Sequence, residues 1–296
     1  MATRDKYLSS IKDPNTIITP IDSATRFPEI LEACQSKYRE DIGLFKKMIE
    51  QSSSSADLLV RIRQASVHKD TRMSLLKMFR RCVSPVLDTE MTKKINSVST
   101  QSLIENYGAT FKSIKKLREQ FRALSPEGDA ALAALIGEYD TRGQLGYHLT
   151  ELFFSWFEDS FSGVLTINGP RGAGRDVELN TIFPDFPGNY PCDFVIRKTA
   201  GNDVVAIGFA RYDSTRGGAQ SDDRTGGNAN KVDKAREFCE RTGKKLKLIF
   251  LADGPGLGHR DTWEEACTLD GRWNGNVRVT TLKTAADRIN KEWLLS

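Results

Sequence analysis

The chain has 296 residues, of which 39% are hydrophobic and 28% are charged, and its formal net charge is +4. This composition is typical of a globular protein and excludes a fibrous or disordered chain. The sequence holds no apolar run near the length of a membrane span, and its first residues lack the apolar core of a signal peptide. We therefore expect a cytoplasmic protein without membrane contact.

Cysteines and histidines are too few and too scattered to suggest a metal centre of their own. The five cysteines never occur as a CxxC pair, and the three histidines are far apart in the sequence. This spacing predicts neither a disulfide framework nor a zinc site. Any catalytic metal must then be held by carboxylates, which favours Mg²⁺.

Charge is distributed unevenly along the chain. Residues 1–127 contain 22 Lys and Arg against 15 Asp and Glu, whereas residues 128–296 contain 21 against 24. The balance is therefore +7 in the first part and −3 in the second. Such an asymmetry is typical of a part that grips a polyanion joined to a part that bears catalytic carboxylates. Ordinary surface charge that happens to segregate is the alternative.

The first part, residues 1–127, is predicted to be an all-helical domain. Apolar residues recur at helical spacing from about residue 29 to 124, as in the stripe of Phe45 and Ile49. Lys77, Arg80 and Arg81 lie three and four residues apart, so they share a helix face. We interpret this face as a contact for DNA phosphates, and the region as a DNA clamp or dimer contact, although a solvated helix face has the same pattern.

The second part, residues 128–296, alternates between helices and strands. In chain order we expect a helix at 144–161, strands at 163–168, 192–197 and 203–213, a helix at 228–243, a strand at 245–253, a helix at 261–269, a strand at 276–282 and a helix at 284–294. Neighbouring strands followed by a crossover helix and another strand predict an α/β fold with a mixed sheet and helices on both faces.

Two segments carry a resemblance to a known family, namely IFPDFPGNYPCDFVIR at 182–197 and VVAIGFARYDSTRGGAQSDDRTGGN at 204–228. With the order of elements over 144–252, they resemble the PD-(D/E)XK nuclease superfamily, and the whole chain resembles a type II restriction endonuclease. The resemblance implies a restriction-endonuclease-like fold and Mg²⁺-dependent hydrolysis of double-stranded DNA. It also implies a homodimer, because a symmetric DNA site is cut on both strands.

In that family an aspartate after a proline opens one strand and provides a metal ligand. Asp193, after a Pro-Cys dipeptide, is our choice for that ligand, with a capping or turn carboxylate as the alternative. Asp185 matches the motif name literally but lies in a loop rich in proline and glycine. Glu151, on the preceding helix, is a possible third metal ligand because family members often place an acid there, and a solvated glutamate is its alternative.

The family places an acid and a lysine on the next strand, and this sequence departs from that pattern. Counting along the strand puts Gly208 and Ala210 at these positions. Strand alternation instead predicts that Arg211 and Asp213 project beside Asp193. We therefore expect Asp213 as the second metal ligand and Arg211 in place of the lysine. Because arginine is not a base at neutral pH, a metal-bound hydroxide would provide the nucleophile.

The loop at 214–228 is predicted to read DNA bases. Its candidate residues are Arg216, Gln220, Arg224 and Asn228, because arginine reads guanine edges, and glutamine or asparagine reads adenine edges, through paired hydrogen bonds. Its glycines would let the backbone approach DNA closely. A flexible surface loop without contacts is the alternative.

Residues 169–176, GPRGAGRD, nearly match a phosphate-binding P-loop. That motif requires Lys and then Ser or Thr, whereas here Arg175 is followed by Asp176, which would repel phosphate, and no helix is predicted to follow. We therefore expect no nucleotide cofactor. Arg171 and Arg175 are interpreted as contacts for DNA phosphates, with an Arg175 to Glu178 pair as the alternative.

Two other functions fit the same scaffold. A non-catalytic DNA-binding protein would keep the nuclease fold without its chemistry, as Gly208 and Ala210 would permit. A repair-type or RNA-directed nuclease would keep the chemistry on a different substrate.

Overall fold

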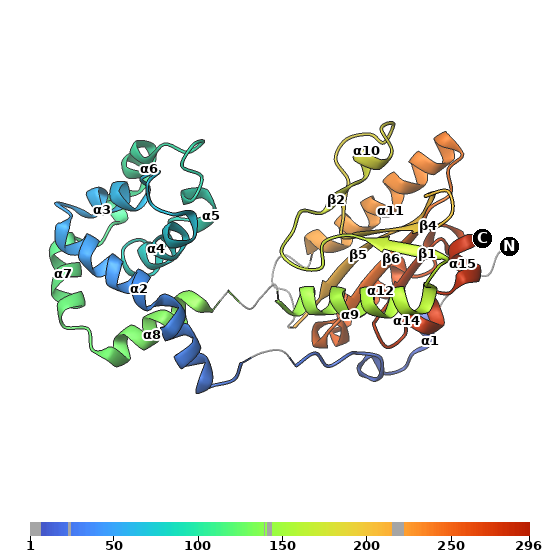
Figure 1. Cartoon of the computed structure of the whole chain (residues 1–296), viewed down its shortest axis with the longest axis horizontal. Coiled ribbons are helices and arrows are strands. Elements are labelled where there is room, and N and C mark those ends of the chain that lie inside the picture. The colour runs from blue at the N-terminus through green and yellow to red at the C-terminus, as the bar shows by residue number, and fades with distance from the viewer. Residues whose placement is uncertain (1–6, 23–24, 139, 141–143, 215–221) are drawn as a thin grey trace. The chain divides into compact units, whose positions relative to one another are not determined.

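The computed structural model describes residues 7–22, 25–138, 140, 144–214 and 222–296. Its contacts divide the chain into two units (Figure 1), a helical unit, Ala24–Thr141, and an α/β unit formed by Met1–Ser23 with Arg142–Ser296. The structural division thus falls after residue 141, whereas the sequence placed it after residue 127. The reason is α8 (Pro126–Gly137), which packs against α2 (Glu29–Gln51) of the helical unit.

The helical unit confirms the expected helical N-terminal region. After α2 it contains α3 (Ser55–Ile62), α4 (Lys69–Cys82), α5 (Thr89–Thr92), α6 (Thr100–Tyr107) and α7 (Ile114–Arg122), followed by α8. Their apolar stripes meet in one core that includes Phe45, Phe79 and Leu117. Four helices begin at serines whose side chains accept a hydrogen bond from a backbone N–H of the first turn, at positions 54, 99, 113 and 125. In the described part of the chain, no helix combines the length and apolar character that crossing a bilayer requires.

The α/β unit contains a five-stranded mixed sheet, as the sequence predicted. Its strands are β1 (Leu165–Asn168), β4 (Phe194–Lys198), β5 (Val204–Tyr212), β6 (Lys247–Asp253) and β7 (Val277–Thr280), in the spatial order β1-β4-β5-β6-β7. The pairs β1·β4 and β4·β5 are antiparallel, whereas β5·β6 and β6·β7 are parallel. A separate small ladder joins β2 (Val177–Glu178) to β3 (Pro191–Cys192).

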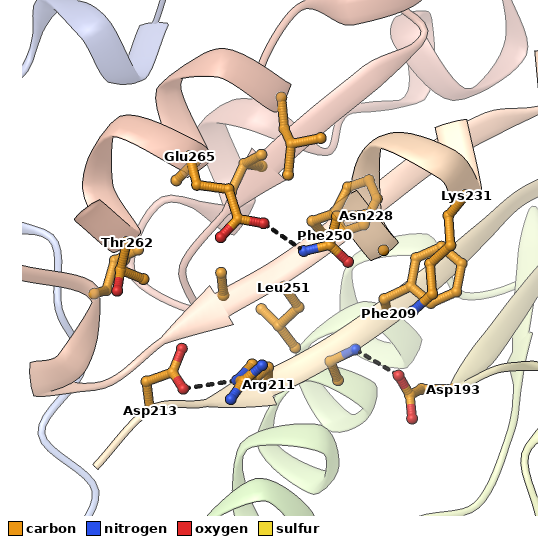
Figure 2. Close-up of a pocket in the computed structure, with 17 residues that line it drawn as sticks. Asp193, Phe209, Arg211, Asp213, Asn228, Lys231, Phe250, Leu251, Thr262 and Glu265 are labelled. Carbon is orange, nitrogen blue, oxygen red and sulfur yellow. Dashed lines mark hydrogen bonds and ion pairs between the residues drawn. The ribbon is translucent and has the colours of Figure 1, made fainter. Parts of the chain in front are cut away.

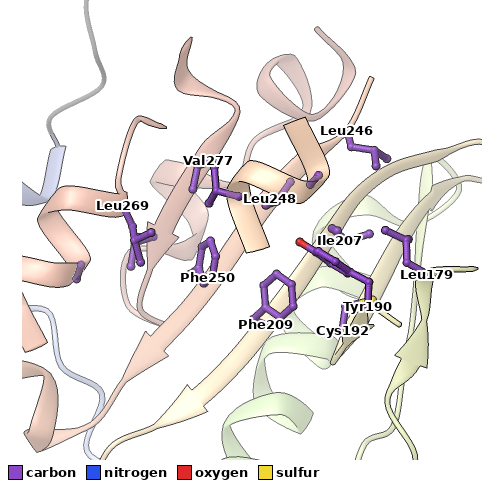
Figure 3. Close-up of a cluster of buried hydrophobic side chains, with 14 of the residues drawn as sticks. Leu179, Tyr190, Cys192, Ile207, Phe209, Leu246, Leu248, Phe250, Leu269 and Val277 are labelled. Carbon is purple, nitrogen blue, oxygen red and sulfur yellow. The ribbon is translucent and has the colours of Figure 1, made fainter. Parts of the chain in front are cut away.

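Helices cover both faces of this sheet. On one face α11 (Asp222–Thr242) and α12 (Arg260–Leu269) pack over a core that includes Phe209, Leu248 and Phe250 (Figure 3). On the other face α9 (Gln144–Phe161) packs through Phe153 and Phe157 onto residues of β4, β5 and β6. The short α-helices of this unit are α1 (Tyr7–Ser10), α10 (Leu179–Ile182), α13 (Arg272–Gly275), α14 (Ala285–Arg288) and α15 (Lys291–Leu295), and two 3₁₀ helices lie at Pro14–Thr16 and Pro255–Gly258.

Two helices differ from the sequence prediction. Helix α11 begins at Asp222 and not at residue 228, so the predicted base-reading loop ends in helix. A pair of aspartates is favourable in the first turn of a helix, but the adjoining glycines at 226 and 227 obscured this signal. The predicted helix at 284–294 is two helices, because Asn290 interrupts it and caps α15 by accepting a hydrogen bond from the Trp293 N–H.

The segment 7–22 belongs to the α/β unit and is held there by buried carboxylates. Asp270 accepts a hydrogen bond from the Leu8 N–H at 3.2 Å and forms a buried ion pair with Arg288. Asp253 accepts one from the Thr19 N–H at 2.8 Å. Because this segment and residues 142–296 form one body, the helical unit is an insertion into the α/β unit.

Candidate active site

A cavity of about 480 Å³ lies on the face of the sheet that carries α11 and α12 (Figure 2). Its polar lining comes from the ends of β3 and β5 and from the two helices, and consists of Asp193, Arg211, Asp213, Asn228, Lys231, Thr262 and Glu265. The predicted catalytic residues Asp193, Arg211 and Asp213 all line this cavity, but Figure 2 shows Asp193 and Asp213 on opposite sides of Arg211.

Asp193 sits between β3 and β4 and is fixed from two sides by β5. Its backbone N–H donates to the Gly208 carbonyl at 2.9 Å, and its Oδ2 accepts from the Ala210 N–H at 2.8 Å. Burial raises the pKa of Asp193, and the negative charge of Asp176 acts in the same direction, while the Ala210 N–H and Lys231 oppose the shift. The folded protein thus holds this carboxylate where a further cation would stabilise its charged form.

Asp176 is a second carboxylate at this point, and the sequence analysis missed it. In the antiparallel ladder Val177 pairs with Cys192, so the residue before Val177 lies across from the residue after Cys192. These residues are Asp176 and Asp193. The loop before Asp176 also approaches Asp193 closely, because a Cβ at Gly169 would lie 2.2 Å from the Asp193 carbonyl oxygen. Glycine at position 169 therefore lets the segment that leads to Asp176 pass close to the Asp193 backbone.

Lys231 on α11 is the second functional candidate that the sequence analysis missed. Its Nζ lies 3.9 Å from the centre of the Phe209 ring, within the cavity lining. Burial lowers the pKa of Lys231, whereas Asp193 and Asp176 act to raise it. One sequence signal could have revealed it, because Lys231 shares the apolar stripe of its helix with Ala235 and Phe238, where a lysine is unusual.

Arg211 and Asp213 form an ion pair at the end of β5. The Arg211 Nε donates to the Asp213 Oδ1 at 2.6 Å. The Asp213 side chain is almost fully buried, whereas about half of the Arg211 side chain is exposed. The carboxylate therefore orients a half-exposed guanidinium that lines the cavity.

Gly208 does not lie across from Asp193, where a second catalytic acid would be needed. Counting residues along the strand had assigned that position to Gly208, and the register corrects this assignment. Phe194 pairs with Gly208, so the residue across from Asp193 is Phe209, with Arg211 two residues farther along the same face. A Cβ at Gly208 would point to the opposite face and lie 1.9 Å from the Phe194 ring. Glycine at this position is thus required by packing.

The structure pairs Glu151 and Arg171 with each other. The Arg171 Nη1 donates to Glu151 at 2.8 Å, and its Nη2 contacts Glu158 of the same helix. The guanidinium also lies 5.2 Å from the centre of the Phe154 ring. Arg171 therefore fastens its loop to α9, and Glu151 lies outside the cavity lining. Arg175 is exposed, and the Glu178 carboxylate accepts a hydrogen bond from the Tyr190 N–H at 3.1 Å.

The predicted base-reading residues fall into two groups. Arg216 and Gln220 lie outside the described residues, as does the side chain of Arg224, whose backbone belongs to the start of α11. Asn228 lies on α11, not in a loop, and its Nδ2 donates to the Glu265 Oε1 at 3.0 Å.

Two of the three basic residues predicted to bind phosphate on α4 form ion pairs within the helical unit. Lys77 forms an ion pair with Asp140 at 2.6 Å, and Arg81 forms one with Glu138 at 3.0 Å. Arg80 is exposed. Two of the three residues therefore pair with carboxylates at the end of α8 and just after it, and phosphate binding by this face stays a prediction.

The described residues contain no group of three or more His, Cys, Asp or Glu side chains that could enclose a metal. Mg²⁺ does not require such a group, because it is usually held by one or two carboxylates, substrate phosphates and water. Asp176 and Asp193 fit that requirement. Comparisons with protein families, curated proteins and solved structures gave no match for this chain.

Proposed function

We propose that this protein is a Mg²⁺-dependent, site-specific endonuclease that hydrolyses double-stranded DNA on a restriction-endonuclease-like fold. The observation that carries the proposal is the position of Asp176 across from Asp193, where Asp193 lines a cavity together with Lys231. Two facing carboxylates and a half-buried lysine are the groups that phosphodiester hydrolysis with a hard cation requires.

When bound by Asp176 and Asp193, Mg²⁺ would neutralise charge on the scissile phosphate and acidify a water molecule. Asp193 is already ordered by the Ala210 N–H and turns toward β5. Lys231 would hold a phosphate oxygen or the attacking water, because it lines the same cavity as Asp193. Arg211 would contact a second phosphate oxygen, with Asp213 as its positioning residue.

Replacing Lys231 by methionine is expected to lower the cleavage rate by about 10²- to 10⁴-fold, because a positioned proton-transfer or charge-stabilising group is lost. DNA affinity should change much less. Single-turnover cleavage assays and binding titrations measure the two effects. The control is Lys234→Met, an exposed lysine on the same helix. Equal rates for wild type and Lys231→Met would remove Lys231 from the site.

Asparagine substitutions separate the two candidates for the second metal ligand. Asp176→Asn is expected to raise the Mg²⁺ concentration needed for half-maximal cleavage by at least about tenfold, because one of two charged ligands is lost. Asp213→Asn should leave that concentration nearly unchanged and weaken DNA binding, since loss of the charge weakens its ion pair with Arg211. The reverse result would assign the metal to Asp213, the ligand expected from the sequence.

A direct test of the function is incubation with phage DNA. Discrete fragments in the presence of Mg²⁺, absent with EDTA, are expected for a site-specific nuclease. Intact DNA under a range of divalent ions would overturn the proposal. Sedimentation of the free and DNA-bound protein tests the homodimer, which cutting both strands of a symmetric site calls for.

One observation favours a second function, a DNA-binding protein without catalysis. The residue across from Asp193 on β5 is Phe209, which binds no metal. That protein would bind DNA with strong salt dependence and never cut it. A repair-type nuclease on the same scaffold would instead cut damaged or structured DNA in competition with intact duplex.

A further inference from the structure

The cavity extends beyond the phosphate-handling residues to a polar wall on α11 and α12. This wall is formed by Asn228, Thr262 and Glu265, and Figure 2 shows Asn228 and Glu265 directed toward one another. The volume of about 480 Å³ lies within the range of cavities that hold small organic ligands, roughly 300 to 1,000 Å³. The cavity is thus larger than hydrated Mg²⁺ and one phosphate require.

The floor of the cavity is apolar. Phe209 and Phe250 stand side by side on neighbouring strands with ring centres 5.1 Å apart. Leu257, Leu269 and Val279 also belong to the apolar lining. An apolar floor beside a basic group can hold the ring of a base and an adjoining phosphate.

The polar wall presents hydrogen-bond acceptors. Asn228 donates its Nδ2 to the Glu265 Oε1 at 3.0 Å, which directs the amide nitrogen toward the carboxylate. The amide oxygen of Asn228 and the second oxygen of Glu265 are both acceptors. A ligand that matches this wall must therefore offer donors, ideally two side by side, since a carboxylate accepts two parallel hydrogen bonds.

We propose that this cavity receives one unpaired guanine base, with Glu265 accepting from its N1–H and its 2-amino group. Guanine is the only standard base with two adjacent donors on its Watson–Crick edge. Adenine and cytosine place a ring-nitrogen acceptor beside their amino group, and thymine flanks its single N–H with two carbonyl oxygens, so each would bring acceptor against acceptor.

The source of the guanine is a nucleotide extruded from the DNA duplex, because its Watson–Crick edge is otherwise paired. In enzymes that act on DNA, contacts of the extruded base with a complementary pocket can offset the free energy of unstacking it. Arg211 and Lys231 line the same cavity and would hold the adjoining phosphates. The inference rests on the proposed DNA substrate, but it makes a claim about base identity that cleavage alone does not test.

The test measures binding of the full chain to duplexes that carry a single bulged nucleotide, by fluorescence anisotropy in EDTA so that nothing is cut. A bulged dG is expected to bind at least about tenfold tighter than a bulged dA, dC or dT. Glu265→Gln should abolish this preference, because its amide replaces one acceptor by a donor. The matched control is Glu264→Gln, whose carboxylate pairs with Arg260 on the surface of the same helix.

Each outcome decides the inference. Equal affinity for the four bulges, or a guanine preference that survives in Glu265→Gln, overturns the inference. If the wild-type protein still cleaves DNA with Mg²⁺ in that case, the proposed function stands without the guanine pocket. A guanine preference without cleavage supports the pocket and contradicts the nuclease. Tight binding of free dGMP over dAMP, with no preference among the bulges, would show that the guanine comes from a free nucleotide and overturn the extruded base. No binding to any duplex overturns both proposals.

Discussion

Replacing Asp193 by asparagine is expected to reduce DNA cleavage by at least about 10²-fold while DNA binding persists. Asparagine has nearly the same shape and keeps an acceptor for the Ala210 N–H, so only the charge is lost. Its unfolding midpoint at neutral pH should be unchanged or higher, because the raised pKa of Asp193 means that the folded state disfavours the ionised carboxylate. Cleavage assays and thermal unfolding measure the two effects.

The matched control is Asp185→Asn, in the exposed loop that matches the family motif literally. It should cut DNA at the wild-type rate. Asp193→Ala should be as inactive as Asp193→Asn, and slightly less stable because it also leaves the Ala210 N–H without its acceptor. A wild-type rate for Asp193→Asn would refute the mechanism.

The same carboxylate sets the acidic side of the pH profile. The raised pKa of Asp193 predicts that activity falls with decreasing pH sooner than an ordinary aspartate would cause. Raising the Mg²⁺ concentration should move this fall to lower pH, because the cation favours the ionised form. If the pH profile does not change with Mg²⁺ concentration, the loss of activity at low pH is not caused by protonation of a metal ligand at Asp193.

Gly208→Glu, which restores an acid where a count along β5 places one, is expected to unfold the α/β unit and yield no active enzyme. The new Cβ would lie 1.9 Å from the Phe194 ring, within the core that joins the sheet to α9. Overpacking of this kind costs about 1–3 kcal/mol or more, and burying an unpaired carboxylate adds several kcal/mol. Together these terms approach the whole stability of a domain, about 5–15 kcal/mol.

Gly208→Ala separates the two terms, since it adds the Cβ without the charge. We expect it to fold with a free energy of unfolding lowered by about 1–3 kcal/mol in urea titrations. The control is Gly146→Ala on α9, where a Cβ meets open space and helix propensity favours alanine. A folded Gly208→Glu protein with increased cleavage would instead show that position 208 is a catalytic position.

The order of helices and strands could be predicted from the sequence because periodicity is a local property. The grouping of Asp193 with Arg211 and Asp213 also followed from strand alternation and the expected neighbouring strands. Asp176 could not be found in this way, because its place depends on the register of a ladder only two residues long. Register likewise decided that Phe209, and not Gly208, faces Asp193.

The partners of charged side chains also could not be predicted from the sequence. Lys77 and Arg81 show the spacing of a basic face, but their charges are taken by Asp140 and Glu138, about 60 residues away in the chain. Glu151 and Arg171 were assigned separate roles and instead pair with each other. Such pairings depend on how distant segments pack, which no local pattern records.

The inserted helical unit gives the protein an unusual dependence on its first residues. Asp253 and Asp270 hold the segment 7–22 to the rest of the α/β unit. The two connections to the helical unit, before Ala24 and after Thr141, therefore both start from the α/β unit. A single protease cut in one of these connections would leave the two units joined through the other. After a cut before Ala24, the released N-terminal peptide would still be bound by these carboxylates. Loss of the helical unit therefore requires two cuts, and a truncation of the first 22 residues would remove one of its two attachments.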